Sequence, residues 1–369
     1  MSRRWFWGLA VLAGMAAQPA VAQEQPERVH LHGFGSWNYG RTDGNEYLGA
    51  EEDGSYDSAS FALNAVGEVS SKLRVVGQLE WRDEEEPNEI EFDYAFAEWT
   101  FSSGLKLRAG KVKQPFGISA EVFDVGTLRP FLQLPQAVYG KAGLVGENYK
   151  GVGLTGSFEG RGGWGLNYDV YGGGQELEEF APPEAVLLGE EFDEPEELER
   201  TRDMLGARAV VQTPLRGLTF GGSGYIGHEI GSARRHGLGA QVEYLDGPWS
   251  LRSEFVHETV QDDEKADGFY AEAAYRLGAH WQLAGQYGHF KAEFAGPAVV
   301  DAPSLLEHEE WVAGLNYWWS PSFVMKASYH HVDGNRFAVP PLDTLAEAAA
   351  AGTLEPRTSA FLAGVQFSF

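Results

Sequence analysis

The end of the chain, Arg357-Thr-Ser-Ala-Phe-Leu-Ala-Gly-Val-Gln-Phe-Ser-Phe369, decides the fold. Its alternate positions carry apolar residues, namely Phe361, Ala363, Val365, Phe367 and Phe369, and the positions between them are mostly small or polar. A period of two residues is typical of a β-strand with two unlike faces. The pattern favours a strand with lipid on one side and a watery lumen on the other. The alternative is the last strand of a soluble sandwich.

Segments with similar alternation recur along the whole chain and together predict sixteen β-strands. An even number of strands with both chain ends at the same end of the sheet is typical of bacterial outer-membrane barrels. The predicted strands cover residues 29–40, 58–69, 73–82, 90–101, 105–113, 148–158, 164–173, 202–212, 218–228, 235–245, 248–258, 268–277, 280–291, 308–319, 322–332 and 357–369.

The connections between these strands alternate strictly between short and long. The short ones are rich in turn formers, as in Asp246-Gly247 and Ser320-Pro321. The long ones are 41–57, 83–89, 114–147, 174–201, 229–234, 259–267, 292–307 and 333–356. This alternation predicts an all-β fold, a transmembrane up-and-down antiparallel β-barrel of sixteen strands. A sandwich with Greek-key crossings has no reason to produce it.

One face of most predicted strands is apolar, and the other carries charges of both signs. Such a charged face would be costly to bury in a soluble protein but is stable in a water-filled lumen. The segment 90–101 has no clear faces, because its aromatic residues fall on both. Charged residues that we expect on the lumen wall include Arg74, Glu80, Arg82, Arg252, Glu254 and Lys326.

The amino terminus resembles a segment that directs export. Arg3 and Arg4 precede the apolar run 5–17, and Ala20-Val21-Ala22 follows as a small-residue cleavage site, so residues 1–22 are predicted to be a signal peptide. The chain has no cysteine and a formal net charge of −26. These properties argue against a disulfide framework and against binding to nucleic acid through its phosphates. No cofactor is predicted.

The longest connection, 114–147, is the third long loop, and it is locally basic in an acidic chain. Its own apolar residues predict a packed loop, which would narrow the pore and present positive charge if it folded into the lumen. A solvated extracellular loop is the alternative. The predicted constriction residues in and near this loop are Lys106, Arg108, Lys111, Lys113, Arg129 and Lys141.

The segment Leu107-Arg-Ala-Gly-Lys-Val-Lys-Gln-Pro-Phe-Gly117 resembles a segment of Gram-negative porins in the wider phosphate-selective porin O/P-like group. Val365-Gln-Phe-Ser-Phe369 is similar to the terminal signature that the barrel assembly machinery reads in such proteins. The resemblance implies a homotrimer in the outer membrane, with residues 23–369 as one porin domain and 114–147 as an inward constriction loop. It also implies passive diffusion of small hydrophilic or anionic solutes.

The chain departs from the phosphate-selective pattern because it lacks a dense ladder of Arg and Lys on successive strands. The predicted inward acids and bases are balanced, so we expect opposing rows of charge and a modest anion preference at the constriction. The acidic loop 174–201 could bridge lipopolysaccharide through divalent cations, but a solvated charged loop is the favoured interpretation. The histidine pairs His30/His32 and His330/His331 lack a third ligand, and no metal site is predicted.

Two other functions remain open at this point. One is a closed structural or adhesive barrel, against which the glycines on the predicted inward faces argue. The other is an outer-membrane hydrolase, for which the sequence offers no Gly-x-Ser-x-Gly motif and no recognisable Ser–His setting. An enzyme is therefore not predicted.

Overall fold

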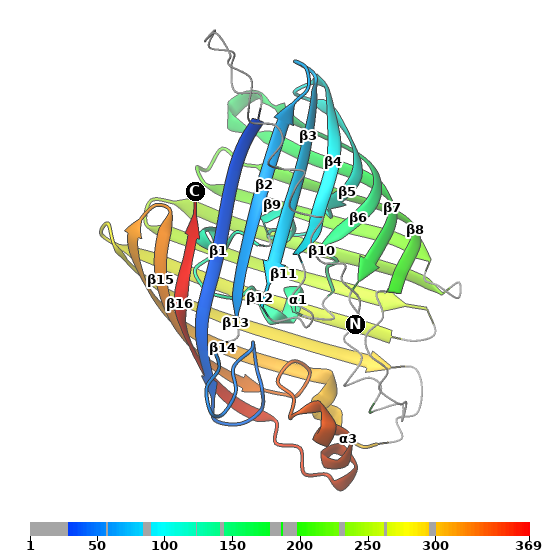
Figure 1. The fold of residues 1–369 in the computed structure, drawn as a ribbon. Helices are drawn as coiled ribbons and strands as arrows, with labels where there is room; N and C mark the ends of the chain where they lie inside the picture. The colour runs from blue at the N-terminus through cyan, green and yellow to red at the C-terminus, as the bar shows by residue number, and fades with distance from the viewer. Residues whose placement is uncertain are drawn as a thin grey trace, which may run out of the picture.

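Figure 1 shows the computed structural model, a single closed barrel of sixteen antiparallel strands. Each strand pairs with its neighbours in the chain, and β1 closes the cylinder by pairing with β16. The structure describes residues 29–56, 58–83, 90–122, 124–140, 144–177, 186, 198–228, 233–261, 264–294 and 300–369. The predicted signal peptide, 1–22, lies outside these ranges and stays a prediction.

The strands agree closely with the ranges predicted from the sequence, and every predicted range overlaps one strand. They are β1 (Val29–Thr42), β2 (Ala59–Glu68), β3 (Leu73–Arg82), β4 (Ile90–Ser102), β5 (Leu105–Lys113), β6 (Asn148–Glu159), β7 (Gly165–Leu177), β8 (Leu198–Gln212), β9 (Leu218–His228), β10 (Arg234–Asp246), β11 (Trp249–Val260), β12 (Glu264–Leu277), β13 (Trp281–Phe294), β14 (Glu307–Ser320), β15 (Phe323–Asp333) and β16 (Arg357–Ser368). The predicted up-and-down barrel is confirmed, and a two-sheet sandwich is excluded because all strands belong to one sheet.

The two faces of the wall are in contact with different surroundings, as the alternation predicted. On β15, Met325 and Tyr329 are exposed on the outer face, while Lys326, Ser328 and His330 are buried inside. Large apolar side chains are exposed in the same way on the other strands. A soluble protein rarely exposes so large an apolar surface, whereas a barrel in lipid requires it.

A β-bulge explains why the faces of 90–101 could not be assigned from the sequence. The pairing of β3 with β4 shifts by one residue between Gln78 and Leu79, so Asp93 is the extra residue on β4. Ile90 and Phe92 are exposed before the bulge, and after it Trp99 and Phe101 are exposed although their parity is opposite. A bulge changes which positions face outward, so no single period of two fits the strand.

The terminal Phe369 completes the closure of the barrel. Its backbone N–H and C=O exchange hydrogen bonds of 2.8 and 3.0 Å with Gly33 on β1. The ring lies over Gly33, where a Cβ would overlap it, and stacks on Phe61 with a centroid distance of 6.2 Å. Phe369 is therefore held by β1 and β2 on the outer face, and its recognition by the barrel assembly machinery stays a prediction.

Several long connections fold over their end of the barrel, which we call the long-loop end. Tyr47 of the first loop is buried against Glu310 of β14, and Phe337 of the last loop packs on Phe290 of β13. Helix α3 (Leu342–Ala351) carries Leu345 and Ala349, which join an apolar cluster with Leu305 and other loop residues. Among the described residues, no helix is long and apolar enough to cross a membrane. Much of the acidic loop, 178–185 and 187–197, lies outside the described residues.

The contact between β1 and β16 gives a test of barrel closure. A Cβ at Gly364 would overlap the carbonyl oxygen of Trp37 and lie 2.7 Å from Cβ of Asn38, whereas at Gly285 of β13 it would meet only an ordinary contact at 3.8 Å. We expect Gly364→Ala to lower stability by about 1–3 kcal/mol, as overpacking does. Gly285→Ala, the matched control, should be neutral. For both variants, the measurement is the temperature at which heating changes the mobility of the barrel in gel electrophoresis. Equal temperatures for the two variants would contradict the closure argument.

Candidate functional site

The third long loop, 114–147, runs inside the barrel. It contains the short helices η1 (Ala120–Val122), η2 (Gly126–Leu128) and α1 (Gln136–Tyr139). Its backbone is bonded to distant parts of the inner wall: Gly117 N–H donates to Ser223 on β9 at 3.0 Å, and Asn316 on β14 donates to Pro130 O at 2.7 Å. These bonds confirm the prediction that the loop folds into the lumen and exclude the solvated alternative.

Apolar packing holds one side of the loop against β11, β12 and β13. Ala137, Val138 and Tyr139 of α1 are buried in a cluster with Val256, Tyr270 and Phe290 of these strands. The Tyr139 hydroxyl donates to Glu254 at 2.6 Å and accepts the backbone N–H groups of Ile118 and Ser119 at 3.0 Å. Burial raises the pKa of Tyr139, and Glu254 raises it further, so this hydroxyl stays a donor.

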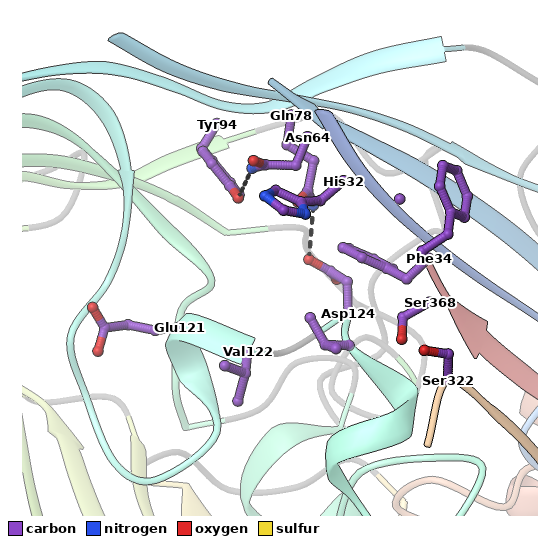
Figure 2. Close-up of a pocket in the computed structure, with 13 residues that line it drawn as sticks. His32, Phe34, Asn64, Gln78, Tyr94, Glu121, Val122, Asp124, Ser322 and Ser368 are labelled. Carbon is purple, nitrogen blue, oxygen red and sulfur yellow. Dashed lines mark hydrogen bonds between the residues drawn. The ribbon is translucent and has the colours of Figure 1, made fainter. Parts of the chain in front are cut away.

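The lumen remains open on the other side of the loop, against β1, β2, β3 and β4. A cavity of about 440 Å³ lies there, between the inner wall and the loop (Figure 2). We call it the lumen cavity. It is lined by His32, Gly33, Phe34, Asn64, Gln78, Tyr94, Glu121, Val122, Asp124, Val125, Ser322, Ser368 and Phe369. Solutes that pass the loop on this side would cross this space.

Lys326 of β15 anchors the middle of the loop. Its Nζ donates to the backbone carbonyls of Gly126, Arg129 and Phe131 at 2.9, 2.6 and 3.0 Å, and it also contacts Gln366. Lys326 is buried beneath the loop. Its ammonium group therefore binds backbone carbonyls of the loop and is not presented to the open lumen.

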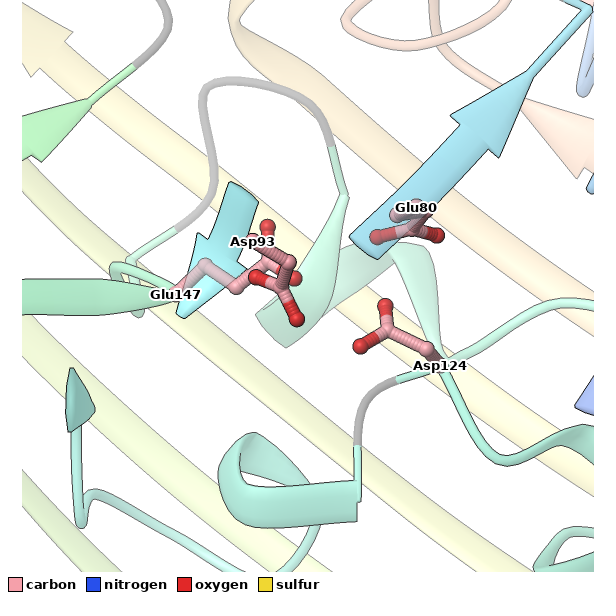
Figure 3. A group of neighbouring side chains, drawn as sticks. All are labelled: Glu80, Asp93, Asp124 and Glu147. Carbon is pink, nitrogen blue, oxygen red and sulfur yellow. The ribbon is translucent and has the colours of Figure 1, made fainter. Parts of the chain in front are cut away.

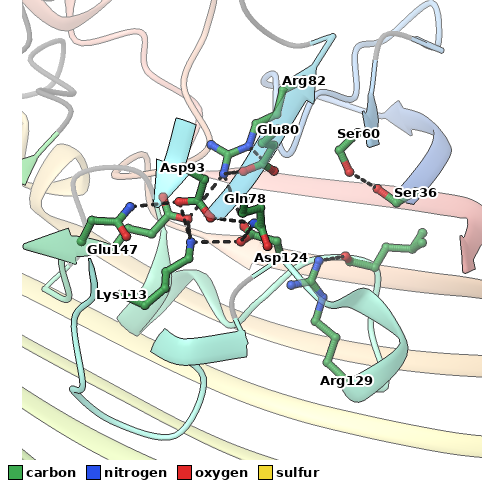
Figure 4. Close-up of polar contacts among 12 residues, drawn as sticks. Ser36, Ser60, Gln78, Glu80, Arg82, Asp93, Lys113, Asp124, Arg129 and Glu147 are labelled. Atoms are coloured by element: carbon green, nitrogen blue, oxygen red, sulfur yellow. Dashed lines mark hydrogen bonds and ion pairs between the residues drawn. The ribbon is translucent and has the colours of Figure 1, made fainter. Parts of the chain in front are cut away.

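An ion-pair cluster, which we call the anchor cluster, ties both ends of the loop to β3, β4 and β5 (Figures 3 and 4). Lys113 Nζ lies 2.9 Å from Asp93 and 2.9 Å from Asp124, and it also contacts Glu147. Arg82 pairs with Glu80 at 3.0 Å and with Asp124 at 3.4 Å. The members of the anchor cluster are Glu80, Arg82, Asp93, Lys113, Asp124 and Glu147.

The four carboxylates of the anchor cluster have oxygen atoms within 4.8 Å of one another, as in a metal site. Here the Lys113 ammonium group and the Arg82 guanidinium group already contact these oxygens. The cations that pair with the carboxylates are therefore side chains of the protein itself. Burial alone would raise the pKa of Asp124, but Lys113 and Arg82 outweigh it and lower the pKa to about 2. Asp124 is thus ionised over the physiological range, and the cluster is an electrostatic anchor of the loop.

A row of alternating charge crosses β3, β4 and β5 on the inner wall. Glu98 lies opposite both Arg74 and Arg108 in the register, and its oxygens are 2.8 and 2.9 Å from their guanidinium groups. Lys106 is 3.7 Å from the same carboxylate. Arg74, Lys106 and Arg108 are 41%, 33% and 20% exposed, whereas Glu98 is 1% exposed. We call these four residues the basic row, because its cations face the water and its acid lies behind them.

A row of opposite sign crosses β10, β11 and β12. Arg252 lies between Glu243 and Glu272 in the register and pairs with them at 2.7 and 3.2 Å. We call these three residues the acidic row. β4 and β12 are eight strands apart in the closed order, so the two rows lie on opposite walls. Arg108 and Arg252 are each the fourth residue of their strand from the short-turn end, so the rows have similar heights.

The loop also contributes Glu121 to the basic wall. Glu121 pairs with Arg108 at 3.4 Å and contacts Arg208 of β8. Burial opposes ionisation of Glu121, but Arg208 and Arg108 outweigh it and lower its pKa below the usual range. The tip of the loop thus reaches the wall beside the basic row.

Residues 8–336 of the chain match the family described as Gram-negative porin. The chain belongs to this family. The match and the sixteen-stranded barrel identify an outer-membrane channel, as the sequence predicted. In a comparison with curated protein sequences, none matches this porin.

Solved structures similar to this porin are themselves outer-membrane proteins. The Salmonella typhi OmpF complex with daunomycin has a TM-score of 0.58 at 13% identity, over 92% of this chain and 97% of that one. The anion-selective porin from Comamonas acidovorans has a TM-score of 0.56 at 11% identity, over 92% and 99%. In-vitro folded OmpT of Vibrio cholerae in its trimer form has a TM-score of 0.54 at 12% identity, over 92% and 99%. At these identities the likeness shows the fold alone.

The porin does not bring together the five predicted constriction residues that the structure describes. Lys106 and Arg108 lie in the basic row, and Lys113 is buried in the anchor cluster. Arg129 donates to the carbonyl of Leu132 at 2.8 Å within the loop. Lys141 lies outside the described residues.

The inward placement of Lys111 is wrong. The register sets Lys111 opposite Ala95 and Lys150, on the outer face of β5, and its Nζ donates to the carbonyl of Phe92 at 3.1 Å. Alternation from Lys106 and Arg108, which face inward, continues without a bulge to this position.

The predicted wall residues occupy inner-face positions, but they have different contacts. Arg74 and Arg252 belong to the charged rows, while Glu80, Arg82, Glu254 and Lys326 hold the loop. Sequence reasoning missed Asp93, Glu98, Glu121 and Asp124. The alternation of Glu98 with Ala97 and Trp99 would have revealed it, had the bulge at Asp93 been recognised.

Two lysines on β5 offer a matched test of the anchor cluster. Lys113→Met would remove the cation that Asp93 and Asp124 share, and breaking such a buried ion pair costs about 3–5 kcal/mol. Lys111→Met, two residues earlier on the outer face, should change stability by less than about 0.5 kcal/mol. We expect Lys113→Met alone to lower the unfolding temperature and to expose the loop to protease. If both variants behaved alike, the assignment of Lys113 to a loop anchor would be refuted.

Proposed function

We propose that this porin is a water-filled channel for passive diffusion of small hydrophilic solutes and ions, with a modest anion preference. The observation that supports this proposal is the pair of opposed rows. The basic row has three cations and one carboxylate, and the acidic row has two carboxylates and one cation. With Glu68 of β2, which faces Arg74 in the register, and Glu121 of the loop, which pairs with Arg108, the formal charges of this wall are balanced. The proposed preference therefore rests on the exposure of Arg74 and Lys106.

The anion preference is assigned to the basic row because its cations have exposed ends. The charges of Lys113 and Lys326 are compensated by carboxylates and by loop carbonyls, so they contribute little to the field in the water. Arg74 and Lys106 share a single buried carboxylate with Arg108 and keep donors for a passing anion. At a distance of roughly 8 Å in water, one charge contributes about 0.5 kcal/mol, or a factor of about two. The preference should therefore be modest.

Charge removal in the basic row tests the selectivity. We expect the double variant Arg74→Gln/Lys106→Gln to reduce the anion-to-cation permeability ratio by about twofold to fivefold, because two exposed charges are lost. The measurement is the reversal potential of the purified porin in planar bilayers under a potassium chloride gradient. The shift should shrink at high salt, where charges are screened.

Lys111→Gln is the matched control, since it removes a lysine from the same strand as Lys106 but on the outer face. It should leave the reversal potential unchanged. A double variant with wild-type selectivity would refute the basic row as the origin of the preference. Absence of any conductance in the folded porin would instead favour the closed structural or adhesive barrel.

We also propose that the porin is a homotrimer. The resemblance of its sequence implies this assembly, and OmpT of Vibrio cholerae, which has the same fold, is described in a trimer form. Sedimentation velocity in detergent should give a mass of three chains, which should fall to that of one chain after heating. A single-chain mass before heating would contradict the trimer.

A hydrolase is the less favoured alternative, although three side chains are linked by hydrogen bonds in the Ser–His–acid order of a catalytic triad. Ser328 Oγ lies 2.8 Å from His330 Nε2, and His330 Nδ1 lies 2.7 Å from Glu310. All three side chains are buried, and Tyr47 donates to the same carboxylate oxygen at 2.7 Å. The lumen cavity is lined by none of them. We therefore propose that this network holds the first long loop and that the porin is not an enzyme.

A further inference from the structure

The lumen cavity is lined by aromatic, aliphatic and polar side chains, a combination that a simple diffusion path does not require. One wall carries Phe34 and His32 of β1 with Tyr94 of β4, and the loop opposite contributes Val122 and Val125 (Figure 2). Its volume of about 440 Å³ is within the range of small-molecule pockets, roughly 300–1,000 Å³. No lysine or arginine lines it.

The two carboxylates of the cavity are already paired with cations of the protein. Glu121 is bound by Arg108 and Arg208, and Asp124 by Lys113 and Arg82. A cationic solute would therefore compete with the protein's own cations. An anionic solute would find no lysine or arginine among the lining residues. Neither sign of charge gains a clear advantage in this cavity.

Uncharged hydrogen-bonding groups remain available there. Asn64 uses its amide N–H₂ to donate to the Tyr94 hydroxyl at 2.5 Å (Figure 2), and its carbonyl oxygen makes no hydrogen bond to the residues that the structure describes. Within the described part of the chain, no hydrogen bond is made by the His32 ring, and Ser368 contributes a hydroxyl at the lower edge. These groups lie beside the apolar faces of Phe34, Val122 and Val125.

We propose that the lumen cavity is a binding subsite for a neutral, polyhydroxylated ring of monosaccharide size. Such a ring has apolar C–H faces that fit Phe34 and the two valines, and hydroxyl edges that bond Asn64, Tyr94 and His32. Its hydroxyl groups would otherwise lose hydrogen bonds to water on entering a narrow pore, and the polar wall replaces them. The inference rests on the proposed diffusion function, because the cavity lies on the solute path.

Three sugars of equal ring size test the class of ligand: glucose, glucosamine and glucuronate. Binding to the detergent-solubilised porin is measured by saturation-transfer NMR, and entry into the pore by sugar-induced current noise in planar bilayers. We expect glucose to bind more tightly than both charged sugars. Phe34→Ala and Asn64→Ala should each weaken glucose binding roughly threefold to tenfold, the effect of losing one ring contact or hydrogen bond.

Two matched controls separate the subsite from general damage. Phe220→Ala removes a phenyl ring from the outer face of β9, and Asn167→Ala removes an amide from β7 outside the cavity. Both should bind glucose like the parent porin. The proposal is overturned if glucosamine or glucuronate binds best, or if the controls lose as much affinity as Phe34→Ala and Asn64→Ala. It is also overturned if a conducting porin shows no glucose binding, a result that leaves the channel function intact. A porin that binds glucose without conducting would refute the channel instead.

Discussion

The structure depends on the requirement that every backbone N–H and C=O group in the hydrocarbon region be paired within the protein. A sheet meets this requirement only when it is closed, and here the bonds of Phe369 to Gly33 complete the pairing of β1 with β16. Closure exposes one face of the wall to lipid and the other to water, and the alternating sequence matches these surroundings on most strands, with a bulge on β4. Apolar side chains then face lipid at no cost, and charged side chains are available for the lumen.

Two kinds of contact hold the third long loop inside the lumen of this porin. Apolar packing of α1 holds the third loop against β11, β12 and β13, whereas ion pairs hold it against β3, β4 and β5. The apolar side excludes water, and the open side keeps it. On the open side Glu80, Asp93 and Lys113 are themselves buried, and each carboxylate of the anchor cluster lies beside a lysine or arginine of the protein. The path for solutes is therefore placed beside the anchors.

Alternation and connection length in the sequence predicted all sixteen strands and the closed barrel, because both depend on local patterns. The inward loop was predicted from its own apolar residues and from the resemblance to porins. The partners of the charges were harder to predict. Asp93 becomes an inward residue only through a bulge, and Lys111 and Lys113 differ although both follow the same alternation in the sequence. Lys326 was correctly assigned to the inner face, but its carbonyl partners lie 195 to 200 residues away. Such contacts are created by the fold and leave no local pattern.

A count of basic residues is consequently a poor guide to the field in a pore. The loop region is rich in lysine and arginine, yet Lys113 is buried among carboxylates. Lys326 of β15 is likewise buried and is covered by backbone carbonyls of the loop. The field in the water arises where the cation is more exposed than its partner, as for Arg74 and Lys106 around Glu98. The same reasoning makes the lumen cavity nearly neutral despite two carboxylates, since each carboxylate is paired with two cations of the protein. Selectivity by charge and selectivity by hydrogen bonding can thus occupy adjacent parts of one wall, because β4 carries Glu98 in the basic row and Tyr94 in the cavity.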